Sequence, residues 1–242
     1  MKVLVIPDIH LKPWMFTQAD HLLQHGAANL AVCLMDIPDD WNKEFDIQLY
    51  ADTYDEAIRF AVKYPQTRWC YGNHDLCYLW HEVESGYSSM ASGTVQRKLL
   101  ELRRAVPEDN PILYVQRIDN VLFSHGGVLD DFVKAYASGK DYNDVDAVVN
   151  RINELRPDSM WNDASPIWLR PQYRKMRMYK PRKLLQVVGH TPVKEITKQG
   201  SVISCDVFST YRNGQPIGTE EFLLLDTETW GYAGVKGDCL DY

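Results

Sequence analysis

Short apolar runs alternate with amphipathic stretches in the first hundred residues, and this alternation predicts strands and helices in turn. Buried strands are predicted for residues 2–8, 30–36 and 67–73. Apolar positions at helical spacing predict helices for residues 17–29, 44–65 and 96–104. A strand, a helix and then a second strand is the order of a parallel βαβ unit, so we expect parallel pairing here.

The pattern is looser in the second half of the chain. Residues 112–118 and 120–126 predict a hairpin, because Asp119 and Asn120 favour a turn between them. Further helices are predicted for residues 131–137 and 144–155, and further strands for residues 184–190, 201–207 and 221–227. No repeat or linker divides the chain. The sequence therefore predicts one α/β domain over residues 1–242, with parallel strands first and antiparallel strands later.

The composition is that of an ordinary globular protein, with 45% hydrophobic residues in a chain of 242. The N-terminus lacks a signal-peptide core, and no run approaches the roughly 18 apolar residues of a membrane span, so no membrane partner is expected. The five cysteines contain no C-x-x-C pair, which disfavours a disulfide framework and a zinc ribbon. A reducing, cytoplasmic location is the simplest interpretation.

The charge of the chain is unevenly distributed. A formal net charge of −7 argues against a surface that binds nucleic acid as a whole. Residues 170–183, however, hold seven basic residues and no acidic one. This run is equally compatible with a solvated surface and with a local anion-binding segment, so nucleic acid stays open as a partner.

Polar side chains gather where five of the predicted strands end. They are Asp8 and His10, Asp36, Asn73 to Asp75, Ser124 and His125, and Gly189 to Thr191. The carboxyl ends of strands in α/β sheets hold loop side chains close together, so these residues are expected to share one site. Their oxygen and nitrogen donors suit manganese, iron or zinc. Six such donors fit two metals about 3.5–4 Å apart that share a carboxylate, an arrangement suited to displacement at phosphorus.

The motifs Asp-x-His, Asp-x-x-Asp, Gly-Asn-His-Asp, His-Gly-Gly and Gly-His-Thr follow one another from Asp8 to His190. In this order they resemble the calcineurin-like metallophosphoesterases, in the branch of serine/threonine protein phosphatases and symmetrical diadenosine tetraphosphate hydrolases. Pro192 stands where the nuclease branch has the second His of Gly-His-x-His. The resemblance implies an α/β (α+β) fold, a β-sandwich of two mixed sheets flanked by helices.

The resemblance also implies a metal-dependent phosphoric ester hydrolase with two divalent ions, manganese first and iron, zinc or nickel as alternatives. A hydroxide between the metals would attack phosphorus directly. The implied ligands are Asp8, His10 and Asp36 for the first metal, and Asp36, Asn73, His125 and His190 for the second. Asn73 would also bind substrate. His74 would donate a proton to the leaving oxygen, and Asp39 would orient it.

Three positions depart from the family pattern. Met35 stands where the family has glycine, and Asp40 and Tyr71 stand where it has phosphate-binding arginines. Arg170, in the Trp-rich segment 161–171, is a candidate replacement for these arginines; the alternative is a surface arginine beside Trp168. Asp40 is expected to face solvent or to pair with a base from residues 170–183.

Three functions are compatible with the sequence. The first is a phosphatase of the Ser/Thr phosphatase-like or bis(5'-nucleosyl)-tetraphosphatase-like type, acting on a phosphoprotein, a dinucleoside polyphosphate or a nucleotide. The second is a phosphodiesterase or nuclease that uses residues 170–183 to bind a nucleic-acid backbone. The third is a binding scaffold without catalysis, which the complete set of implied ligands disfavours.

Overall fold

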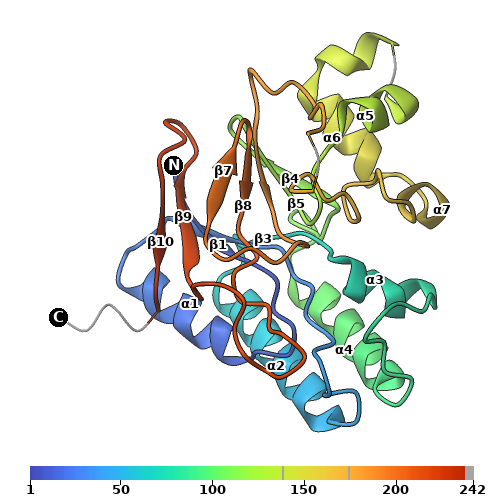
Figure 1. Ribbon diagram of the computed structural model, residues 1–242, viewed down its shortest axis with the longest axis vertical. Coiled ribbons are helices and arrows are strands. Elements are labelled where there is room, and N and C mark those ends of the chain that lie inside the picture. The colour runs from blue at the N-terminus through green and yellow to red at the C-terminus, as the bar shows by residue number, and fades with distance from the viewer. Residues whose placement is uncertain (138, 174, 238–242) are drawn as a thin grey trace.

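The computed structural model describes residues 1–137, 139–173 and 175–237, which form two mixed five-stranded sheets (Figure 1). The first sheet contains, in spatial order, β10 (Tyr232–Val235), β9 (Phe222–Asp226), β1 (Lys2–Ile6), β2 (Leu30–Cys33) and β3 (Arg68–Trp69). The second contains β4 (Val115–Ile118), β5 (Val121–Ser124), β6 (Leu185–Val188), β8 (Val202–Ser204) and β7 (Thr197–Gln199). The predicted β-sandwich of two mixed sheets is confirmed.

Helices flank both sheets. Beside the first sheet lie α1 (Trp14–Gln24), α2 (Ile47–Lys63), α3 (Asn73–Trp80) and α4 (Ser92–Ala105). Beside β4 and β5 lie α5 (Asp130–Tyr136), the 3₁₀ helix η1 (Gly139–Asn143), α6 (Val145–Asn153) and α7 (Pro157–Met160) (Figure 1). None of the helices in the described ranges is long and apolar enough to cross a membrane.

The first strand is buried on both faces, which explains its uninterrupted apolar sequence. Val3 and Val5 point into the space between the sheets, where they pack with residues such as Phe123 of the second sheet. Leu4 and Ile6 point the other way, into the core that the helices cover. A strand between two cores needs apolar residues at every position, as parallel strands of α/β proteins do.

The strand pairing differs from the sequence prediction in the second half of the chain. The predicted hairpin of β4 and β5 is confirmed, but β5, β6 and β8 run parallel to one another. The expectation of antiparallel strands in this half is confirmed for β4 with β5, for β7 with β8 and for β9 with its neighbours, and it was wrong for β5, β6 and β8. Parallel neighbours need a long connection that returns the chain to the other end of the sheet, and residues 125–184, with their helices, supply it between β5 and β6.

Some element boundaries were also predicted wrongly. The third strand ends at Trp69, several residues before the predicted end at Asn73, because α3 begins there. The Asp75 carboxylate accepts a hydrogen bond from the Gly72 N–H at 3.0 Å, which caps the first turn of this helix. The helix α3 and the short elements η1, β7, β10 and α7 were not predicted from the sequence.

The ends of β1, β2, β5 and β6 meet at one edge of the sandwich. Backbone pairing continues past the strands, because the N–H of His10 donates to the Asp36 carbonyl at 2.9 Å. On the second sheet, the N–H of Gly189 donates to the His125 carbonyl at 2.9 Å. The loops that carry the polar motifs are therefore held by backbone hydrogen bonds that continue the pairing of the strands.

Candidate metal centre

Asp8, His10 and Asp36 form a first cluster, with one ligand atom of each lying within 4.8 Å of the others. The His10 Nε2 is 3.4 Å from the Asp36 Oδ2. The His10 Nδ1–H donates to the Asp39 carbonyl at 2.8 Å, which leaves Nε2 with a free lone pair directed toward Asp36. The cluster could therefore hold a cation through two carboxylates and one neutral imidazole.

Asp36 also belongs to a second cluster. Its Oδ2 lies 3.5 Å from the His125 Nε2, which is 2.9 Å from the Asn73 Oδ1 and 3.0 Å from the His190 Nδ1. Atoms bonded to one metal at about 2.0–2.2 Å lie roughly 3–3.5 Å apart, so these separations fit a shared ion. The Asp36 Oδ2 is thus common to both clusters.

Each central carboxylate has one oxygen held by the backbone and the other free to face the centre. The N–H of His190 donates to the Asp8 Oδ2 at 2.8 Å, and the N–H of His74 donates to the Asp36 Oδ1 at 2.8 Å. The buried Asp8 Oδ1 has no hydrogen-bond partner among the described residues. Such an oxygen is costly without a cation or donor beside it, and this supports the interpretation as a metal ligand.

Two glycines make room for these carboxylates. A Cβ at Gly189 would lie 1.9 Å from the Asp8 Oδ1, and one at Gly72 would lie 2.3 Å from the Asp36 Oδ1. No side chain can be placed at either position without moving a carboxylate. The Gly-His-Thr and Gly-Asn-His-Asp motifs therefore need glycine at these positions, because the Asp8 and Asp36 carboxylates lie too close to the backbone for a Cβ atom.

Burial sets the protonation of the cluster. It raises the pKa of Asp8 well above its usual range, with the charges of Asp206 and Asp36 adding to the effect. Burial also raises the pKa of Asp36 to about 7 and lowers the pKa values of His125 and His190 well below their usual range. Neutral imidazoles are the form that binds metal, and a cation would offset the cost of the crowded carboxylates. The residues present fit divalent cations.

Several residues of the site have a left-handed backbone. The φ angles are 42° at His10, 51° at Met35, 50° at Asp36, 66° at Asp39 and 63° at His190. A residue with a side chain costs about 1–3 kcal/mol in a sparsely populated region, so the loops are strained. Met35 occupies the position where relatives carry glycine, and its φ explains that preference.

His74 lies beside the metal clusters and is held by a buried carboxylate. The His74 Nδ1–H donates to the Asp39 Oδ2 at 2.9 Å, and the Asp39 Oδ1 accepts from Tyr50 at 2.8 Å and Tyr78 at 2.5 Å. Burial opposes the charged imidazole, but the Asp36 charge and the Asp39 hydrogen bond outweigh it and raise the pKa of His74 to about 9. In the metal-free site, these contacts favour the protonated imidazole. The two tyrosines were not identified from the sequence.

Asp75 does not face the cleft. Its carboxylate accepts from the N–H of Asp36 at 2.9 Å and of Ile37 at 3.2 Å, and from the Tyr54 hydroxyl at 3.2 Å. It therefore fixes the backbone that carries the shared Asp36. In the sequence, the only indication of this structural role is that Asp75 ends the Gly-Asn-His-Asp motif.

The expectation for Asp40 was wrong. It neither faces solvent nor pairs with residues 170–183: its Oδ2 is 3.2 Å from the Lys12 Nζ, and its Oδ1 accepts from the Thr210 hydroxyl at 2.9 Å. Lys12 is only 8% exposed, so the pair is largely shielded from water. Asp40 ties the loop after the Asp-x-x-Asp motif to a distant part of the chain.

Arg170 lies at the edge of a cleft of about 350 Å³ that also contains His10, Asn73 and His190. Its Nη1 donates to the His190 carbonyl at 2.6 Å and to the Thr191 hydroxyl at 3.3 Å. The Trp168 ring contacts the His190 ring edge to face, with centroids 5.6 Å apart. Arg170 therefore lines the cleft and contacts the residues that follow Gly189.

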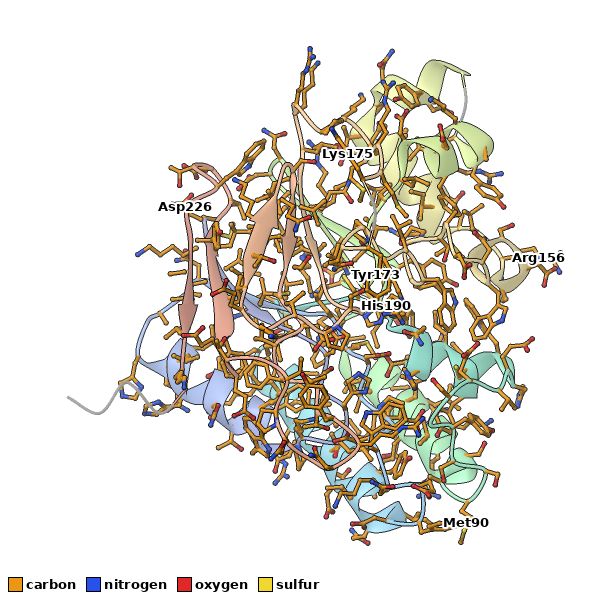
Figure 2. All side chains as sticks on the ribbon, in the orientation of Figure 1. Met90, Arg156, Tyr173, Lys175, His190 and Asp226 are labelled. Carbon is orange, nitrogen blue, oxygen red and sulfur yellow. The ribbon has the colours of Figure 1, made fainter. Side chains whose placement is uncertain are left out.

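The rest of the basic run departs from the cleft. Arg177 Nε lies 3.2 Å from the Asp130 Oδ2, and the Lys180 Nζ donates to the Asn143 carbonyl at 2.6 Å. Figure 2 labels His190 near the middle of the molecule and Lys175 toward its upper edge. Position 174 of the run lies outside the described residues.

The comparisons with known proteins agree with this geometry. The family model of calcineurin-like phosphoesterases matches residues 1–216. A cold-active protein tyrosine phosphatase is 16% identical with a TM-score of 0.59, over 96% of this chain and 78% of that chain. A structure of a mutant cold-active protein tyrosine phosphatase is 14% identical with a TM-score of 0.57, over 97% of this chain and 80% of that chain.

A metallophosphoesterase from Sphaerobacter thermophilus is 14% identical with a TM-score of 0.47, over 98% of this chain and 88% of that chain. No curated protein sequence matches the chain. At such identities the likeness to the two phosphatase structures shows a shared fold.

Gly189→Ala tests whether metal binding needs the Asp8 carboxylate to lie directly against the backbone of residue 189. The new Cβ must displace the Asp8 carboxylate, so manganese affinity is expected to fall at least about ten-fold, as for other changes that misplace a metal ligand. Calorimetric titration of the metal-free protein with Mn²⁺ measures this. Gly93→Ala on α4 is the control, because its Cβ would meet nothing within 4 Å. Unchanged affinity in a folded Gly189→Ala protein would contradict the assignment.

The raised pKa of His74 predicts a pH-dependent stability of the metal-free protein. In the unfolded chain the imidazole loses its proton near pH 6.5, whereas in the folded protein it keeps it to about pH 9. The folded state binds more protons in this window, so the free energy of unfolding should fall as pH rises from 6.5 to 9. Urea denaturation in chelator measures the decline. His74→Gln should flatten it and His25→Gln, at an exposed position, should not; an equal decline in all three proteins refutes the prediction.

Proposed function

The chain belongs to the calcineurin-like phosphoesterase family and is a metal-dependent phosphoric ester hydrolase, and within that family we propose that it is a phosphatase of phosphate monoesters or phosphoanhydrides. The observation that carries the proposal is the Asp36 carboxylate, whose Oδ2 lies 3.4 Å from the His10 Nε2 and 3.5 Å from the His125 Nε2. One oxygen between two sets of ligands favours a binuclear centre. Such a centre binds both the attacking and the leaving oxygen at phosphorus.

Two divalent cations are proposed, manganese first, with iron, zinc and nickel as alternatives. Asp8, His10 and Asp36 would hold one, and Asp36, Asn73, His125 and His190 the other. Bound there, the cations would supply a hydroxide at neutral pH and offset the negative charge of the phosphate.

The remaining chemistry belongs to side chains of the cleft. His74 donates a proton to the leaving oxygen, and Asp39 holds the imidazole with its Nδ1–H committed to the carboxylate at 2.9 Å. The Nη1 of Arg170 binds the His190 carbonyl, and the other N–H groups of this guanidinium are proposed to bind a phosphate oxygen. Asn73, which also lines the cleft, is proposed to contact the same phosphate.

A monoesterase is favoured over a nuclease by the surroundings of the basic run. Arg177 contacts Asp130, and Lys180 binds a backbone carbonyl, so these two side chains make contacts that lead away from the cleft. A nuclease would need them free along a track leading to the metals. The proposed substrates are therefore a phosphoprotein, a dinucleoside polyphosphate or a nucleotide.

A cytoplasmic location is proposed as well. Cys33, Cys70, Cys77 and Cys205 are buried free thiols, and burial raises the pKa of the Cys70 thiol above its usual range. Buried unpaired thiols are typical of proteins in a reducing compartment. Cys239 lies outside the described residues.

A substrate screen with manganese tests the proposed activity. We expect p-nitrophenyl phosphate to be hydrolysed at least about ten-fold faster than its bis-ester, with diadenosine tetraphosphate and a phosphoserine peptide included to define the natural class. Asp36→Asn, which weakens both metal sites, is the control for a contaminating phosphatase. Faster hydrolysis of the bis-ester would favour the phosphodiesterase alternative. No turnover with manganese, iron, nickel or zinc would refute the proposed function.

His74→Asn tests the general acid. Metal content should be retained, while kcat should fall by about 10²–10⁴ for phenyl phosphate, whose leaving oxygen needs a proton. The loss should be much smaller for 2,4-dinitrophenyl phosphate, whose leaving group departs as an anion. His25→Asn, at an exposed position directly after α1, is the matched control. Equal losses on the two esters exclude the role of His74 as an acid.

A further inference from the structure

Two segments that are distant in the sequence form one rim of the cleft. We call residues 40–42 and 209–217 the rim. The Trp41 Nε1–H donates to the Thr210 carbonyl at 3.1 Å, and the Asn42 side-chain amide donates to the Arg212 carbonyl at 2.8 Å. The Asp40 carboxylate accepts a third hydrogen bond between the two segments, from the Thr210 hydroxyl. The first segment therefore holds the second by three hydrogen bonds.

The second segment is itself a closed turn. The N–H of Gly214 donates to the Tyr211 carbonyl at 2.8 Å, and the N–H of Tyr211 donates to the Gln215 carbonyl at 2.9 Å. Gly214 has a φ of 80°, which a glycine adopts without strain. Arg212 is at the second position of this turn, so its backbone is fixed from both sides.

The guanidinium of Arg212 lies over the Trp41 ring, 4.8 Å from the ring centroid. Both side chains line the cleft, together with Tyr211. Across the described ranges no carboxylate forms an ion pair with Arg212, in contrast to Arg117 and Arg151, which pair with acidic neighbours. Arg212 is a positive charge that is held in position and not neutralised.

The rim and the proposed acid belong to the same cleft. Asp39, which orients the proposed acid His74, precedes Trp41 by two residues, so at most about 7 Å of chain separates them. His74, Trp41 and Arg212 all line this cleft. A substrate with its scissile oxygen at His74 therefore shares the cleft with the guanidinium of Arg212.

We propose that Arg212, held on Trp41, binds a second phosphate on the leaving-group side of the substrate, so that the enzyme selects phosphoanhydrides over simple monoesters. The inference rests on the proposed function. In the reaction, a water oxygen that gives up one proton to the solvent forms a bond to the terminal phosphorus, and the bridging P–O bond breaks. The electron pair stays on the departing second phosphate, which takes a proton from His74. Arg212 would bind that phosphate through charge-assisted hydrogen bonds.

Asp40 is occupied with Lys12 and Thr210, which offsets its charge and anchors the turn that presents Arg212.

The test compares two substrates on the manganese enzyme. The measured quantity is kcat/KM for inorganic tripolyphosphate divided by kcat/KM for p-nitrophenyl phosphate. Arg212→Ala should lower this ratio about ten- to hundred-fold, the effect of one charge-assisted hydrogen bond. Arg212→Lys should restore part of it, and Trp41→Leu should lower it through loss of the stack. Arg151→Ala on α6 removes one exposed arginine elsewhere and should leave the ratio within about two-fold. An unchanged ratio in Arg212→Ala overturns the proposal.

A binding measurement separates this proposal from the proposed function. Methylenediphosphonate, which resists hydrolysis, should bind the manganese enzyme about ten-fold more weakly after Arg212→Ala, whereas inorganic phosphate should bind with little change. Weakened diphosphonate binding in a protein that hydrolyses nothing would refute the proposed function and support the anion site. Normal turnover of p-nitrophenyl phosphate with diphosphonate binding unaffected by Arg212→Ala would refute the anion site alone.

The nature of the second anion is also tested. Phosphoserine peptides with an acidic or a neutral residue after the phosphoserine provide the comparison. If Arg212→Ala lowers the preference for the acidic peptide and leaves the tripolyphosphate ratio unchanged, Arg212 recognises a carboxylate and the assignment to phosphate is wrong.

Discussion

The carboxylate of Asp36 is the interaction on which the site depends. Its Oδ1 accepts the His74 N–H, and its Oδ2 lies between the imidazoles of His10 and His125, which come from different sheets. The backbone of Asp36 is in turn fixed by the Asp75 carboxylate. A single side chain thus connects the first sheet, the second sheet and the start of α3.

This arrangement is destabilising in the absence of cations. Asp8, Asp36, Asp75 and Asp206 are all nearly inaccessible to solvent, and burial raises the pKa of each of them. Hydrogen bonds from backbone N–H groups and tyrosine hydroxyls offset part of the cost at Asp75 and Asp39. The left-handed residues of the loops add strain. The motifs follow directly after buried strands, whose cores surround the site.

The sequence predicted an α/β domain and the convergence of the motif residues, because apolar runs that end in Asp, Asn and His are local signals, and the resemblance to the phosphoesterases implied the sandwich. It failed where the outcome depends on partners far away. The parallel pairing of β5, β6 and β8 follows from a long helical connection, which no local pattern reveals. Tyr50 lies on a predicted amphipathic helix, where apolar periodicity explains it equally well as a packing residue, and Tyr78 lies on α3, a helix that was not predicted. Asp40 was misjudged because its partner Thr210 is 170 residues away.

The contact between Asp40 and the turn at Arg212 has an evolutionary consequence. An arginine at position 40, as in the family pattern that the chain resembles, would remove the anchor of the turn and leave Lys12 without its carboxylate. A cation at position 40 and the proposed anion site at Arg212 are therefore alternatives that cannot be exchanged by one substitution. A lineage that adopted the second would need coordinated changes in both segments to go back, so the difference is expected to persist once it has arisen.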